Sequence, residues 1–114
     1  MNRFDEEDFF EMGKILVWLK EPGKKARHVW ISPSLANLQK TVGGYIESHQ
    51  IATDLILLCD EEGRFKDYEP NVHVSGVEFV GTLLLVGQQG EDFSSCKLTP
   101  DQMRKMFPEW MKED

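Results

Sequence analysis

Short apolar runs separated by turn residues dominate the pattern of hydrophobic and polar positions along the chain. Runs rich in β-branched and aromatic residues predict strands at 14–19, 28–31, 45–51, 55–60 and 77–86. The run at 55–59 is apolar at every position, which is typical of a strand buried on both faces and predicts a central place in the sheet. Gly81 interrupts the last run and indicates a bulge or a close backbone approach. We expect the polar segment from 61 to 76 to be irregular.

Two segments have the signals of short helices. Ser32 is a candidate N-cap, and Pro33 stands at the first helical position. Gly43 can adopt the left-handed backbone conformation that ends a helix, so these signals predict a helix over 33–42. Leu35, Leu38 and Val42 form its apolar stripe. Thr99 and Gln102 have the spacing of a capping box, which predicts a second helix over 100–107, with Met103, Met106 and Phe107 facing one way.

These elements predict an α+β fold in one small domain. The mostly antiparallel sheet has about five strands, and we expect the two short helices to pack on one face. A chain of 114 residues, 40% of them hydrophobic, suffices for one core. We assign residues 13–114 to this domain and residues 1–12 to an acidic arm, with Met12 as a candidate alternative start. The strand-rich half is expected to offer sheet edges for self-association into a homo-oligomer.

The acidity of the chain is concentrated at its N-terminus. The formal net charge is -7, and the first eleven residues contribute -4 of it. Proteins that bind a phosphate backbone neutralise it with Lys and Arg, so this balance argues against nucleic acid as a partner. It favours instead a protein partner bound through the arm, by Asp5, Glu6, Glu7, Asp8 and Glu11.

The usage of cysteine and apolar residues predicts a cytoplasmic protein. Cys59 and Cys96 have no CxxC spacing, and no basic-then-apolar signal segment opens the chain. The longest apolar runs fall far short of the roughly 20 residues that cross a bilayer. We therefore expect reduced thiols and no membrane insertion.

Candidate catalytic and metal-binding residues do not form a recognisable motif. His28, His49 and His73 are spread over strands and a loop, without the convergent spacing of a zinc site, so we predict no metal and no cofactor. Cys59 ends the most apolar run, where a core thiol is the simpler interpretation. The cluster from 60 to 62 is interpreted as a solvated turn. These patterns predict a protein that is not an enzyme.

A basic hairpin tip carries the best candidate for a small-ligand site. Its basic residues alternate with two tryptophans, an arrangement that suits a nucleotide phosphate through Arg contacts and base stacking. A tip kept soluble by lysines is the alternative interpretation. The candidate ligand-binding residues are Trp18, Lys24, Lys25, Arg27 and Trp30, with Lys20 nearby and the loop at Asn71 as a further candidate.

Several segments occur in an order that resembles a known family. The most specific are Val42-Gly-Gly-Tyr-Ile-Glu47 and Cys59-Asp-Glu-Glu-Gly63, accompanied by the strands at 14–18 and 80–87 and by Pro70-Asn71. Together they are similar to the domain of unknown function 3846 family, small proteins of bacteria, their mobile elements and phages. The resemblance covers residues 14–107 and implies a phage or mobile-element context without an established activity. Asn71 is followed by Val72, where the family usually has Arg.

Two functional hypotheses follow from the charge and this context. The first is a non-enzymatic accessory protein that binds and inhibits a host protein, such as an immune nuclease, through its acidic surface. The second is an oligomeric binding protein for a small molecule such as a nucleotide signal, in the manner of an anti-defence sponge. Both place the protein in the cytoplasm of a host bacterium.

Overall fold

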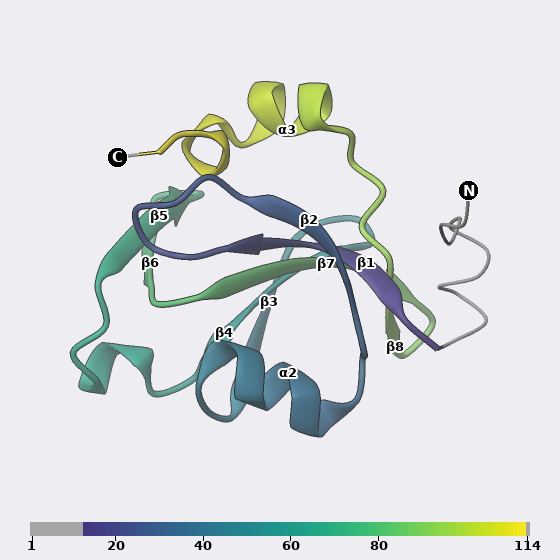
Figure 1. The fold of residues 1–114 in the computed structure, drawn as a ribbon, viewed down its shortest axis with the longest axis horizontal. Coiled ribbons are helices and arrows are strands. Elements are labelled where there is room, and N and C mark those ends of the chain that lie inside the picture. The colour runs from purple at the N-terminus through teal and green to yellow at the C-terminus, as the bar shows by residue number, and fades with distance from the viewer. Residues whose placement is uncertain (1–12, 114) are drawn as a thin grey trace, which may run out of the picture.

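A six-stranded antiparallel sheet forms the centre of the molecule in the computed structural model, which describes residues 13–113 (Figure 1). Its strands are β1 (Ile15–Lys20), β2 (Arg27–Ile31), β3 (Ile46–Ala52), β4 (Leu55–Asp60), β7 (Leu83–Gln89) and β8 (Asp92–Ser94). The order is β2-β1-β7-β4-β3, with β8 pairing β7. β4 is paired on both sides and buried at every position, so its predicted central place is confirmed.

The two helices lie on opposite faces of this sheet, so the expectation that both pack on one face is wrong (Figure 1). α2 (Leu35–Val42) covers one face and α3 (Pro100–Met106) covers the other, followed by the short helix η2 (Pro108–Met111). The reason is visible in the central strands. β4 and β7 are apolar at successive positions, and alternate side chains point to opposite faces, so each face needs a cover. The α+β class itself is confirmed.

The helix ends follow their capping chemistry. Thr99 and Gln102 form both hydrogen bonds of the predicted capping box at the start of α3. The N-cap of α2 is Ser34, whose hydroxyl accepts from the N–H of Asn37, and not Ser32, so this helix begins two residues later than expected. Gly43 ends α2 with φ of 99°, as predicted. Two residues assigned to apolar stripes, Leu35 and Met106, are exposed.

The segment predicted to be irregular contains a short helix and a strand. The helix is η1 (Gly63–Phe65), and the strand β5 (Pro70–Val74) pairs with β6 (Val77–Val80) in a separate two-stranded sheet. The predicted strand at 77–86 is therefore two strands in different sheets. They are separated at Gly81, which has φ of 74° and packs so closely on Tyr68 that an added Cβ would lie 2.7 Å from its ring. The close backbone approach predicted at Gly81 is confirmed.

Candidate functional site

A pocket opens between the main sheet and the β5–β6 hairpin. Its volume is about 200 Å³, and its walls come from β3, β4, η1 and β6. The ionisable side chains that line it are Glu47, His49, Cys59, Asp60, Glu61, Arg64 and Glu78. Phe65 and Phe79 add apolar surface, and the Phe65 side chain is exposed. Ionisable groups from four separate elements thus converge on one concave surface.

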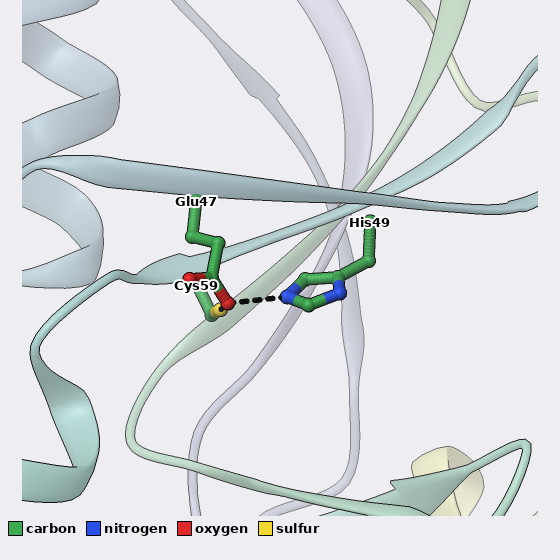
Figure 2. A group of neighbouring side chains, drawn as sticks. All are labelled: Glu47, His49 and Cys59. Atoms are coloured by element: carbon green, nitrogen blue, oxygen red, sulfur yellow. Dashed lines mark hydrogen bonds and ion pairs between the residues drawn. The ribbon is translucent and has the colours of Figure 1, made fainter.

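Glu47, His49 and Cys59 project from the same face of two neighbouring strands (Figure 2). Glu47 on β3 lies directly opposite Cys59 on β4, and His49 lies two residues further along β3, opposite Leu57. A register shift between Gln50 and Ala52 sets this alignment, because it places one extra residue, Ile51, in β3. The strand pairing therefore holds the three side chains together, without any contribution from a loop.

The atoms of this trio are within contact distance of one another. The Nε2 atom of His49 lies 2.5 Å from Oε2 of Glu47, and the thiol of Cys59 donates to the same oxygen at 3.9 Å. One ligand atom from each residue lies within 4.8 Å of the others. The Phe79 ring packs against the imidazole in a T-shaped arrangement, with the ring centroids 5.0 Å apart. The trio presents one nitrogen, one oxygen and one sulfur donor, which is a set that can hold a metal ion.

The electrostatics of the pocket keep the thiol protonated. Burial raises the pKa of Cys59 to about 11, with further contributions in the same direction from the charges of Glu47 and Asp60, and the charge of Arg64 opposes them. The thiolate is the reactive form of cysteine, and a pKa this high leaves little of it at neutral pH. Cys59 is therefore a poor nucleophile in this environment, and its predicted place in the core is confirmed.

Asp60 is buried beside this trio, so the interpretation of residues 60–62 as a solvated turn is wrong for its first member. Its carboxylate accepts from Lys66 Nζ at 2.7 Å, from the Tyr68 hydroxyl at 2.9 Å and from the backbone N–H of Glu62 at 2.9 Å. Burial alone would raise the pKa of Asp60, but these hydrogen bonds outweigh it and lower the pKa below its ordinary value. Glu61 and Glu62 are exposed, as expected of a turn.

The basic hairpin does not present the stacking surface predicted for a nucleotide. Trp18 is only 3% exposed, because it packs in the core under α3, stacks on His28 and donates its indole N–H to the carbonyl of Leu98. Lys20 is also buried and donates to Asn71 Oδ1 at 2.9 Å. The run of β-branched and aromatic residues placed Trp18 correctly on a strand, but the inward face of that strand is covered.

The other predicted ligand-binding residues are engaged within the protein or lie apart from the pocket. Arg27 and Lys24 pair with Glu21, at 3.3 Å and 4.0 Å, while Lys25 is exposed and Trp30 is partly buried on β2. The Asn71 amide donates to the carbonyls of Lys20 and Gly81 and accepts from Lys20 Nζ. These hydrogen bonds join the hairpin to the main sheet, and the ligand-binding role of Asn71 stays a prediction.

The acidic partner-binding residues lie outside the described part of the chain. Asp5, Glu6, Glu7, Asp8 and Glu11 all precede residue 13, so the arm predicted over residues 1–12 stays a prediction. Within residues 13–113, no helix is long and apolar enough to cross a membrane.

Sequence reasoning missed the trio because it treated His49 and Cys59 separately and did not single out Glu47. One signal was present: Glu47 and His49 are two residues apart on a predicted strand, and such residues point to the same face.

Comparison with known proteins supports one relationship. No curated protein and no solved structure matches the chain significantly. A family model described as Domain of unknown function (DUF3846) matches residues 14–111, which is most of the chain, and confirms the resemblance carried by the segments at 42–47 and 59–63. The chain therefore belongs to the Domain of unknown function (DUF3846) family.

Proposed function

We propose that the protein is a binding protein that takes a small, positively charged ligand in the pocket between β3, β4 and β6. The observation that carries this proposal is the excess of carboxylates on the pocket wall. Glu47, Glu61 and Glu78 line the pocket together with a single guanidinium, that of Arg64, while the charge of Asp60 is compensated by Lys66. A concave surface with this balance attracts cations and disfavours phosphates.

The protonation states of the site favour binding over catalysis. An acid–base catalyst works best with a pKa near the operating pH. Here the pKa of Cys59 is raised to about 11, and in the adjoining network the pKa of Asp60 is lowered while those of Lys66 and Tyr68 are raised. Each of these groups is moved away from neutrality, which supports the expectation that the protein is not an enzyme.

This proposal keeps the sequence-based hypothesis of a small-molecule binding protein but changes the site and the charge of the ligand. The hairpin tip was expected to bind an anion between Arg27 and a tryptophan. Trp18 is buried in the core, and Glu21 partly neutralises the positive charge of the tip through its ion pair with Arg27. The pocket, in contrast, has side chains that converge on open space.

Native mass spectrometry of the full-length chain tests the proposal. The protein is measured before and after incubation with a low-molecular-weight extract of bacterial cells. We expect a discrete added mass on the wild-type protein that is lost in Glu47→Gln. Glu91→Gln is the matched control, because it removes the same charge from an exposed turn outside the pocket. The absence of any added mass, or an equal added mass on Glu47→Gln, would contradict the proposal.

The concentration of acidic residues from Asp5 to Glu11 favours a second candidate function, capture of a host protein by a phage or mobile-element accessory protein. An acidic arm of this kind suits a basic channel, such as that of an immune nuclease, and would work in the host cytoplasm. Deleting residues 2–11 is expected to weaken retention of the partner in a pull-down from host cells. Unchanged retention would count against this candidate.

A further inference from the structure

The geometry points to a zinc-class divalent metal ion as the cation of this pocket, and we propose that Glu47, His49 and Cys59 bind it. This inference rests on the proposed function, because it identifies the ligand of the same pocket. One oxygen, one nitrogen and one sulfur atom already lie within 4.8 Å of one another. Within residues 13–113, these three side chains form the group of His, Cys, Asp or Glu residues whose potential ligand atoms lie this close together.

The chemistry of the three donors selects the class of metal. Calcium and magnesium prefer shells made only of oxygen, whereas a thiolate and an imidazole favour zinc and its first-row neighbours. Zinc sites with three protein ligands are common where a fourth position stays open for water or another small ligand. The pocket of about 200 Å³ provides room for that fourth ligand beside the trio.

Small side-chain movements are sufficient to complete the site. Zinc lies about 2.0–2.3 Å from such donors, so tetrahedral ligand atoms are about 3.3–3.7 Å apart. The contact between His49 Nε2 and Glu47 Oε2, 2.5 Å long, has to lengthen, and the contact between Cys59 Sγ and Glu47 Oε2, 3.9 Å long, has to shorten slightly. The metal replaces the thiol proton and the hydrogen bond between His49 and Glu47, and the same atoms stay in contact through it.

The strands hold the donors in place in a way that suits a metal site. Glu47 and Cys59 are a directly opposed pair, so their Cα separation is fixed by the ladder between β3 and β4. His49 is placed by the same strand and by the edge contact of its ring with Phe79. Cys59 is 6% exposed, which protects the sulfur, whereas Glu47 is exposed and His49 partly so, which leaves a route of entry.

Titration of the full-length chain with Co²⁺, a spectroscopic substitute for zinc, tests the inference. We expect one equivalent to bind with the intense visible bands of tetrahedral cobalt and a sulfur-to-cobalt charge-transfer band in the near ultraviolet. One equivalent of Zn²⁺ should abolish these bands. Absence of Co²⁺ binding, or binding without the charge-transfer band, would overturn the assignment.

Variants separate the trio from other cysteine and histidine residues. Cys59→Ala should remove the charge-transfer band, and His49→Gln, which removes a direct ligand, should weaken Co²⁺ binding by more than about 10–100-fold, the range for loss of an outer-shell partner. Cys96→Ala and His73→Gln are matched controls, because both lie outside the trio, and they should leave the titration unchanged. His49 is 36% exposed, so His49→Gln is expected to fold even if Cys59→Ala does not. A titration unaffected by His49→Gln would overturn the assignment.

The failure of this inference can be told apart from failure of the proposed function. If the mass experiment shows an organic cation that is lost in Glu47→Gln, and Co²⁺ does not bind, then the pocket is a binding site and the metal assignment is wrong. If neither an extract component nor Co²⁺ binds, both are wrong. An added mass of one divalent metal ion that is lost in Glu47→Gln, together with Co²⁺ binding and its thiolate band, supports both.

Discussion

Glu47 lies directly opposite Cys59 across the antiparallel pair of β3 and β4, and the carboxylate accepts a hydrogen bond from the thiol. This relationship depends on the extra residue near the end of β3. If the ladder continued without a shift from the pair of Ala52 and Leu55, Ser48 would lie opposite Cys59 and the thiol would point away from Glu47. The bulge at Ile51 thus determines which side chains form the candidate site.

The raised pKa of Cys59 predicts slow alkylation. With a pKa of about 11, the thiolate fraction at pH 8 is on the order of 10⁻³. Iodoacetamide should modify Cys59 at least about 100-fold more slowly than glutathione at this pH, with a rate that rises about tenfold per pH unit up to pH 10. Peptide mass spectrometry separates Cys59 from Cys96. A rate that levels off near pH 8 would contradict the burial and charge assigned to this thiol.

Glu47→Gln is the matched variant for this measurement. The charge of Glu47 is one of the causes of the raised pKa of Cys59, so its removal should shift the alkylation profile to lower pH. An unchanged profile would show that the charge of Glu47 does not contribute to the raised pKa of Cys59.

The buried carboxylate of Asp60 is expected to stabilise the fold. Asp60→Asn leaves Lys66 and Tyr68 without their charged acceptor, and we expect a loss of about 1–3 kcal/mol in the free energy of unfolding. Tyr68→Phe removes one hydrogen bond and should cost about 1 kcal/mol. The exposed neighbour Glu61 is the control, and Glu61→Gln should stay within about 0.5 kcal/mol. Urea unfolding of the three variants checks this ranking, and equal effects at Asp60 and Glu61 would contradict it.

The lowered pKa of Asp60 also predicts a pH dependence of stability. A carboxyl group whose pKa is lower in the folded state contributes stability that is complete above its unfolded pKa, here the ordinary value of 3.8, and lost as the pH falls through the folded pKa. The difference in unfolding free energy between wild type and Asp60→Asn should therefore be constant near neutrality and shrink below about pH 4. A difference that grew on acidification would have the wrong sign.

Contact with Tyr68 explains why residue 81 is a glycine. Gly81 and Gly76 both have positive φ, 74° and 80°, but an added Cβ meets the Tyr68 ring only at residue 81. Gly76→Ala should cost about 1 kcal/mol for its backbone conformation. Gly81→Ala should cost a further 1–3 kcal/mol, roughly, for overpacking. Thermal unfolding of the two variants compares them, and equal losses would show that packing at Tyr68 is unimportant.

Local signals predicted the elements well. The capping box of Thr99 and Gln102, the C-terminal glycine of α2 and the buried run of β4 each depend on neighbouring residues, and each is confirmed. The placing of helices depends on the whole sheet. Both faces of β4 and β7 are apolar, a feature visible in the sequence, and each face therefore needs its own helix, α2 on one and α3 on the other.

The candidate site was less accessible to sequence reasoning, because it depends on strand register. The sequence shows Glu47 and His49 on one face of a strand, but a shift by one residue decides whether Cys59 joins them. Asp60 shows a related difficulty. Its position beside two further acids resembles a solvated turn, while the partners that make its burial favourable, Lys66 and Tyr68, follow six and eight residues later.

Anomalous diffraction at the zinc absorption edge, from crystals of the full-length chain grown with one equivalent of zinc, tests the central claim most directly. The account predicts one strong peak about 2.3 Å from Cys59 Sγ and about 2.0–2.2 Å from His49 Nε2 and a carboxylate oxygen of Glu47. A peak elsewhere, for instance at His73 between Glu78 and Glu109, or no ordered zinc, would contradict it.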